Sequence, residues 1–123
     1  IPMLNDSQLE AVLEAAAGAG AREAAYVMLR LPLEVAELFQ AWLEEHFPER
    51  AARVMNRVRD LRGGRDNDPR FGHRMRGEGV YADLLRQRFA RACRRLGLNR
   101  DRIHLDCSRF APPVRPGQQL ELL

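Results

Sequence analysis

Hydrophobic residues recur with helical spacing in the first segment of the chain. Within residues 7–17 they fall at positions i, i+3, i+4, i+7 and i+8 from Leu9, and Ser7 and Glu10 have the spacing of a capping box. Glycines follow at 18 and 20, and glycine commonly closes a helix because it adopts the left-handed conformation without a steric clash. The pattern therefore predicts an amphipathic helix over 7–17.

The next apolar run has no helical period. Residues 24–29 are apolar at every position, and the run ends at Arg30 and Pro32. A short continuous apolar run is typical of a strand that is buried on both faces, and proline cannot donate a hydrogen bond to a neighbouring strand. The sequence therefore predicts one buried strand over 24–30.

Helical spacing returns after this run. Residues 35–46 carry one apolar stripe, residues 48–61 a second and residues 81–96 a third. Proline at the start of the second stripe and glycines after the second and third are the expected boundary residues. Weaker alternation at 103–107 and at 118–123 predicts short C-terminal strands.

The strand at 24–30 lacks an apolar partner strand elsewhere in the chain. A buried strand needs neighbours on both edges to pair its backbone groups. Helix, glycine turn, buried strand, proline and helix is also the repeating unit of a parallel α/β sheet. We therefore expect a mainly α fold with α/β character, either part of a larger α/β domain or completed by self-association.

Composition narrows the class of protein. Apolar residues make up 46% of the 123 positions, charged residues make up 30%, and no window has the ~18 uninterrupted apolar residues of a membrane span. The chain shows no secretory leader, and its two cysteines are too few for a disulfide-stapled module. We therefore expect a cytoplasmic protein without a membrane partner.

The charge of the chain is divided between its two parts. All 20 basic residues are arginine, and residues 1–49 have a net charge of −7 whereas residues 50–123 have a net charge of +10. The rigid guanidinium fork suits carboxylates and phosphates, so an anionic partner for the second part is one interpretation. Solvated helix faces are the other.

Residues 65–79 form the longest segment without periodicity. The segment contains three glycines and a proline, and a loop of this length in a compact domain commonly binds a ligand or stays solvated. Glycines would let the backbone approach a bulky ligand. The candidate substrate-binding residues are therefore the basic side chains flanked by these glycines, Arg70, His73, Arg74 and Arg76.

Several segments together resemble one enzyme family. IPMLND, YVMLRLPLEV, RFGHRMRGEG, LDCSRFAPP and the terminal GQQLELL are similar to the C-terminal half of the DNA repair photolyase-like subgroup of radical S-adenosylmethionine enzymes, which is related to spore photoproduct lyase. Family members have glycine where this chain has Met3. The resemblance implies that residues 1–32 are the last elements of a partial (β/α) TIM-type barrel, with the last strand at about 24–30. Residues 33–123 would then be a helical C-terminal extension.

The resemblance implies radical chemistry for the whole enzyme. In this family a [4Fe–4S] cluster, held by three cysteines in a C-x3-C-x2-C motif, cleaves S-adenosylmethionine reductively to a 5′-deoxyadenosyl radical. That motif is absent here, and Cys93 and Cys107 are expected to be small core hydrophobes. The chain alone should then bind neither cofactor and be inactive. It would supply a pocket wall and a lid to the upstream barrel half of the same protein.

The resemblance also places candidate cofactor-binding residues. Barrels bind ligands at the carboxyl ends of their strands, where Asn5, Asp6 and Arg30 would lie. Arg30 would meet a substrate phosphate, the methionine carboxylate of the cofactor or a core acid, and Asn5 and Asp6 could instead cap a helix. Among the loop arginines, the resemblance favours Arg74 and Arg76 as the substrate contacts.

A second hypothesis requires no larger enzyme. The chain would be a small Arg-rich helical module, a monomer whose basic part binds nucleic acid or an acidic protein, with an affinity that falls as salt rises. The enzyme fragment, in contrast, should be poorly stable alone or form a homo-oligomer. What lies upstream of Ile1 would decide between the two.

Overall fold

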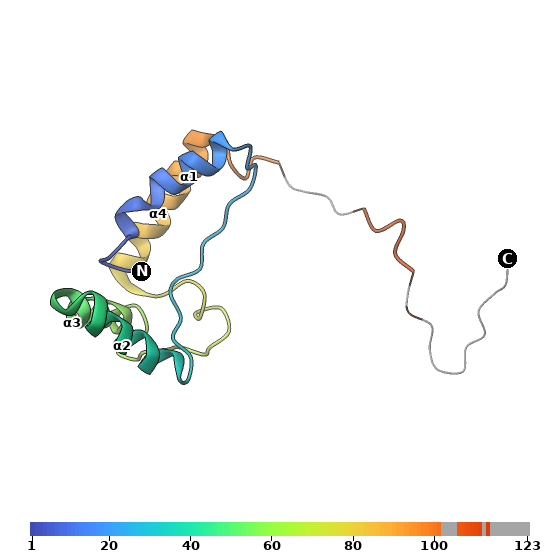
Figure 1. Ribbon diagram of the computed structural model, residues 1–123. Helices are drawn as coiled ribbons and strands as arrows, with labels where there is room; N and C mark the ends of the chain where they lie inside the picture. Colours follow the sequence, from blue (N-terminus) through green and yellow to red (C-terminus); the bar gives the residue numbers. More distant parts are fainter. Residues whose placement is uncertain (102–105, 112, 114–123) are drawn as a thin grey trace.

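The computed structural model describes residues 1–101, 106–111 and 113. The 3-10 turn η1 (Asp6–Gln8) leads into helix α1 (Leu9–Gly18), and α2 (Val35–His46), α3 (Pro48–Asp60) and α4 (Gly79–Leu96) follow. No strand forms among the described residues. The helices make two pairs, and a long extended connection runs from the end of α1 to the start of α2 (Figure 1).

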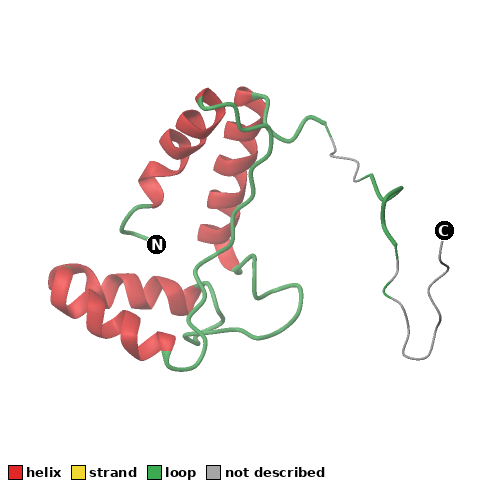
Figure 2. Ribbon diagram, turned by 45° about the vertical axis from the view of Figure 1, so that its right-hand side comes forward, coloured by secondary structure: helices red, strands yellow, loops and turns green. Residues whose placement is uncertain are grey.

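Each helix pair has its own orientation. Helices α1 and α4 lie side by side, and Glu10 pairs with Arg88 while Glu14 pairs with Arg95, so the two helices run parallel (Figure 2). Helices α2 and α3 form a hairpin in which Phe47 alone separates them. None of the described helices combines the length and apolarity needed to cross a lipid bilayer.

The predicted buried strand is wrong. Residues 24–30 are extended. Among the described residues, however, only one hydrogen bond joins their backbone to the backbone of another segment, from the Met28 N–H to the carbonyl of Met75 at 2.9 Å. Burial is one-sided, since Met28 is 4% exposed whereas Val27 is 58% exposed. The described residues therefore form a small helical domain rather than a TIM-type barrel fragment with a sheet strand.

The extended run gains its burial from helices instead of from neighbouring strands. Its apolar side chains reach three separate clusters: Ala24 packs beside the first, Met28 belongs to the second and Leu29 packs beside the third. The buried members of the first cluster are Leu13, Ala92, Cys93 and Leu98. Those of the second are Met28, Leu61, Ala82 and Leu85, and those of the third are Leu31, Leu43, Val54, Met55 and Val58. This explains an unbroken apolar run without a sheet.

The other predicted elements fare differently. The helical hairpin is confirmed, with proline opening α3, and α4 ends at Gly97, whose φ of 72° is left-handed. The predicted capping box at Ser7 and Glu10 is wrong, because η1 precedes α1 and Gln8 is the N-cap, without a side-chain cap bond. Of the strand predicted at 103–107, residues 106 and 107 are not strand and residues 103–105 lie outside the described residues, as does the whole strand predicted at 118–123.

Leu33, between the extended run and α2, holds a strained backbone. Its φ is 47°, and the residue is 86% exposed. A left-handed conformation costs a residue with a Cβ about 1–2 kcal/mol, and asparagine tolerates it best after glycine. We expect Leu33→Asn to raise the free energy of unfolding by about 0.5–1 kcal/mol in urea denaturation. The β-branched Leu33→Val should lower it, and equal stabilities of the three proteins would contradict the assigned strain.

Candidate functional site

Residues 65–78, here named the basic loop, form most of the connection between α3 and α4 and contain all four predicted substrate-binding residues. Backbone hydrogen bonds fix both ends of its last turn. The Glu78 N–H donates to the carbonyl of Leu61 at 3.0 Å, and the carbonyl of Met75 accepts from Met28. The loop is therefore irregular in structure but attached to α3 and to the extended run.

Arg62, which sequence reasoning did not single out, is the main anchor of the basic loop. Its side chain is 2% exposed. Nη1 donates to the carbonyl of Arg74 at 2.8 Å, and Nη2 donates to the carbonyls of Met28 at 2.9 Å and Leu29 at 2.7 Å. Burial lowers the pKa of Arg62, and the nearby carboxylate of Asp68 partly offsets this. One buried guanidinium thus joins the loop to the extended run.

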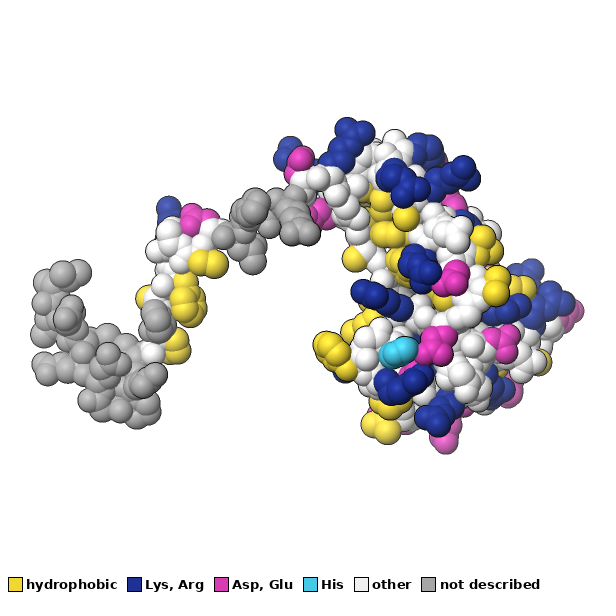
Figure 3. Space-filling view, turned by 180° about the vertical axis from the view of Figure 1, so that it is seen from behind, with side chains coloured by type: hydrophobic (Ala, Val, Ile, Leu, Met, Phe, Trp, Pro, Cys, Tyr) yellow, Lys and Arg dark blue, Asp and Glu magenta, His cyan; other side chains and the backbone are white. Residues whose placement is uncertain are grey.

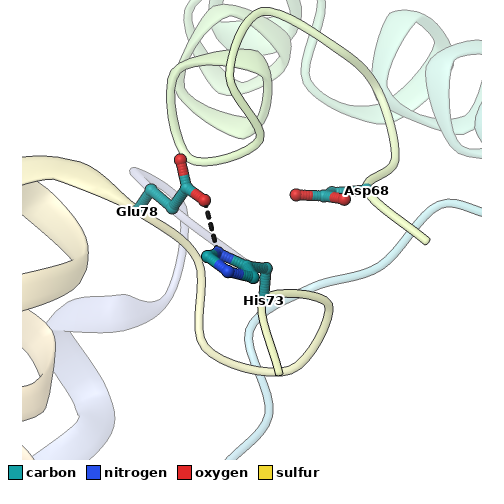
Figure 4. A group of neighbouring side chains, drawn as sticks. All are labelled: Asp68, His73 and Glu78. Atoms are coloured by element: carbon teal, nitrogen blue, oxygen red, sulfur yellow. Dashed lines mark hydrogen bonds and ion pairs between the residues drawn. The ribbon is translucent and has the colours of Figure 1, made fainter. Parts of the chain in front are cut away.

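Arg70 and His73 are engaged within the loop itself. The guanidinium of Arg70 binds Asp68, with an Nη2 to Oδ2 distance of 2.7 Å, and reaches Glu78 at 3.1 Å. The Nδ1 atom of His73 lies 2.5 Å from the same Glu78 carboxylate, and Figure 4 shows the two side chains facing each other. Two of the predicted substrate-binding residues therefore already have internal partners.

Asp68, His73 and Glu78 also have the residue types of a metal site. Their potential ligand atoms lie within 4.8 Å of one another (Figure 4). Both carboxylates, however, already bind the guanidinium of Arg70, so a divalent cation would have to displace a fixed positive charge. The arrangement is that of an ion-pair network that shapes the loop.

Asp68 should make the stability of the fold depend on pH. Hydrogen bonds from the side chain and backbone of Arg70 hold the pKa of Asp68 well below its ordinary value. Such a carboxyl stabilises the folded state above its unfolded pKa of about 3.9, and this contribution is lost as the pH falls toward the folded pKa. We expect the free energy of unfolding to decrease from about pH 5 downward, and Asp68→Asn to make the decrease shallower. Parallel pH profiles of the two proteins in urea denaturation would contradict this.

Arg74 and Arg76 remain available to a ligand. The guanidinium carbon of Arg74 lies over the ring of Phe71, 5.3 Å from its centroid, and Arg76 is exposed. Neither has an ion-pair partner among the described residues. Phe71 itself is 88% exposed. The sequence analysis did not single out this phenylalanine, although an aromatic residue inside an arginine-rich loop was a usable signal.

Arg30 contacts the basic loop at Met75. Its Nη1 atom is 4.0 Å from the sulfur of Met75, and its Nε atom is buried without a hydrogen-bond partner among the described residues. Of the three partners considered for it, the core acid is therefore not found in the described part of the chain.

Asn5 and Asp6 line a pocket of about 240 Å³ beside the extended run. Tyr26 and Met28 form part of the opposite wall, while Arg30 does not contribute to it. Neither residue acts as a side-chain helix cap: Asn5 accepts a hydrogen bond from the amino group of Ile1, and Asp6 accepts one from a tyrosine hydroxyl of α4. The IPMLND segment and the extended run thus meet at one pocket.

Side chains of α4 hold the Asp6 side of this pocket in place. The hydroxyl of Tyr81 donates to Asp6, and the pKa of Tyr81 is raised, first by burial and then by this carboxylate. Arg88 donates to Glu10 at 2.8 Å and to the backbone carbonyl of Asp6 at 3.1 Å. The position of the Asp6 carboxylate therefore depends on packing between α1 and α4.

The outer face of α4 carries a second group of arginines. Leu84, Gln87, Arg91 and Arg94 line a shallow groove of about 440 Å³. Arg91 and Arg94 have no ion-pair partner among the described residues, and arginine side chains are prominent on the face seen in Figure 3. This groove offers a positively charged surface separate from the basic loop.

The two cysteines do not fit an iron–sulfur cluster. Cys93 is buried in the first apolar cluster, where burial raises the pKa of its thiol, whereas Cys107 is exposed. Their expected role in the core thus applies to Cys93 alone. A [4Fe–4S] cluster needs thiolate ligands at close spacing, and thirteen residues separate these two cysteines.

No family model, curated protein or solved structure matches the chain. The resemblance to radical S-adenosylmethionine enzymes therefore stays a prediction.

Proposed function

We propose that the chain is the C-terminal portion of a radical S-adenosylmethionine enzyme and contributes one wall of its cofactor and substrate pocket, with the basic loop as a lid. The observation that carries this proposal is the pocket shared by the IPMLND segment and the extended run. These two segments carry much of the resemblance, and Asn5 and Asp6 stand on the pocket wall. A few polar groups on a mainly apolar wall are typical of ligand sites.

The backbone at Met3 supports the same proposal. Its φ is 62°, in the left-handed region that favours glycine. Glycine is the residue that family members have at this position of the motif. Met3 would keep the backbone conformation of that glycine if the surrounding structure determines the turn.

Exposed apolar side chains beside the pocket also support a larger assembly. Val12 is 62% exposed and Val27 is 58% exposed, and both line the pocket. Contiguous apolar surface of this kind commonly marks an interaction site. The rest of the enzyme would cover it.

The iron–sulfur cluster would be held by another part of the enzyme, because this chain does not supply its ligands. The pocket of about 240 Å³ is smaller than the ~300–1,000 Å³ of a typical small-molecule site, so it would enclose only part of a cofactor. The amide of Asn5 and the carboxylate of Asp6 offer hydrogen bonds to hydroxyl or amino groups there. Arg30 does not line this pocket, so an anionic group bound by its guanidinium would lie outside it.

The test uses the complete protein encoded by the gene. Its upstream reading frame should contain the three-cysteine motif, and the reduced, iron-reconstituted enzyme should convert S-adenosylmethionine to 5′-deoxyadenosine. Asp6→Asn should raise the KM for S-adenosylmethionine. Arg74→Ala with Arg76→Ala should impair substrate turnover while leaving stability nearly unchanged, and the exposed Arg53→Ala on α3 is the matched control. A frame without the motif would refute the proposal.

The groove on α4 favours a second candidate function, a module that binds nucleic acid. The unpaired guanidinium groups of Arg91 and Arg94 follow one helix face, as expected of residues that contact successive phosphates. Binding of duplex DNA to the chain should then weaken steeply with salt, and Arg91→Ala with Arg94→Ala should reduce that salt dependence. Salt-independent binding, or none, would remove this candidate.

A further inference from the structure

Phe71 has the highest exposed fraction of the large hydrophobic side chains in the described chain, at 88%. A single exposed apolar residue needs no explanation by itself. Phe71 differs because it stands in a loop whose other prominent side chains are arginines, and because the guanidinium of Arg74 covers one face of its ring at 5.3 Å. The opposite face of the ring is open to a ligand.

The backbone around Phe71 is held rather than loose. The Arg74 N–H donates to the carbonyl of Arg70 at 3.0 Å, and the Gly77 N–H donates to the carbonyl of His73 at 3.2 Å. Arg62 then binds the carbonyl of Arg74 from the core side. A loop fixed in this way presents an aromatic ring at low entropic cost on binding.

Positive charge without an ion-pair partner in the described chain lies against the ring at Arg74, and Arg76 follows two residues later in the same loop. Arg74 and Arg76 have no ion-pair partner among the described residues, whereas the nearby Arg70 is neutralised by Asp68 and Glu78. An aromatic face beside unpaired guanidinium groups matches a ligand with a flat π system and a neighbouring anionic charge. An acidic peptide would use the charges but would gain little from the phenyl ring.

We propose that the basic loop binds single-stranded nucleic acid, with a base stacked on the open face of Phe71 and the adjoining phosphates bound by Arg74 and Arg76. Stacking on an aromatic side chain contributes about 1–3 kcal/mol per base and tolerates any base, because every base has a π face. The proposal names the substrate class of the lid in the proposed enzyme. Binding is nevertheless measured on the present chain alone, so its failure is distinct from a failure to cleave S-adenosylmethionine.

The test measures fluorescence anisotropy of a labelled oligothymidylate of about 12 nucleotides, within the usual footprint of such sites. Phe71→Ala and Phe71→Leu should each weaken binding by about 5- to 100-fold, since leucine keeps the apolar character but lacks the ring. Phe71→Tyr should bind like the original protein. Leu38→Ala, at an exposed apolar residue of α2 outside the basic loop, is the control and should have no effect.

The salt dependence of binding tests the contribution of the two arginines. Arg74→Ala and Arg76→Ala should each reduce the slope of log Kd against log salt by about one. Three results would overturn the proposal: no binding by the original chain, equal binding by Phe71→Leu, or competition by polyglutamate as effective as by unlabelled oligothymidylate. The last result would assign the loop to an acidic protein instead.

Discussion

Replacing Arg62 by methionine should lower the free energy of unfolding by about 2–4 kcal/mol, because buried carbonyl oxygens would lose their donors. The guanidinium binds carbonyls on the extended run and on the basic loop, and the residue is 2% exposed. Methionine fills much of the same volume, so the loss reports hydrogen bonds more than a cavity. Urea denaturation monitored by circular dichroism measures the change.

Matched variants isolate the cause of this loss. Arg62→Lys keeps the charge but offers one nitrogen, so it should recover only part of the stability. Arg65→Met changes an exposed arginine of the basic loop and should cost less than about 0.5 kcal/mol. Amide hydrogen exchange of Met28, whose N–H binds the loop, should accelerate in Arg62→Met. A cost below about 1 kcal/mol would show that water or other donors replace the guanidinium.

The same contact links the fold to both proposed sites. Arg62 binds both the basic loop, which carries Phe71 and Arg74, and the extended run, whose residues Tyr26 and Met28 line the pocket. A variant that frees the loop should therefore weaken oligonucleotide binding even though Arg62 is too buried to touch the ligand. Arg62 is accordingly a positioning residue for the loop.

The helical hairpin could be predicted because its signals are local. The period of residues 35–46 and 48–61 and the proline that opens the second segment determine both helices within one stretch of chain. The run at 24–30 could not be resolved in this way, because extended backbone becomes a strand only when a distant segment pairs with it. Here the side-chain amide of Asn99 accepts from the Ala24 N–H and donates to the Ala24 carbonyl, both at 2.9 Å. Helices cover the apolar side chains.

The candidate site shows the same division between local and distant information. The sequence indicated the arginine-rich loop, but all of its arginines look alike as letters. Contacts separate Arg62, which precedes the loop and binds backbone, from Arg70, which binds carboxylates, and from Arg74, which stays available. Those differences arise from contacts with the extended run and with Glu78, which spacing along the chain does not reveal.

Leu43→Ala should have the other large effect, lowering the free energy of unfolding by about 2–5 kcal/mol. Leu43 is fully buried between α2 and α3, where it packs with Leu31, Val54 and Val58. Alanine would leave a cavity at the point where the hairpin meets the end of the extended run. Thermal or urea unfolding of the purified chain measures the loss.

Leu38→Ala in the same helix is the control for this cavity. Leu38 is 67% exposed, so its truncation removes little buried surface and should cost less than about 0.5 kcal/mol. If the rest of a larger enzyme covers that side of α2, the cost of Leu38→Ala should increase in the complete protein while the cost of Leu43→Ala stays the same. Equal effects of the two substitutions in the isolated chain would contradict the assignment of Leu43 to the core and Leu38 to the surface.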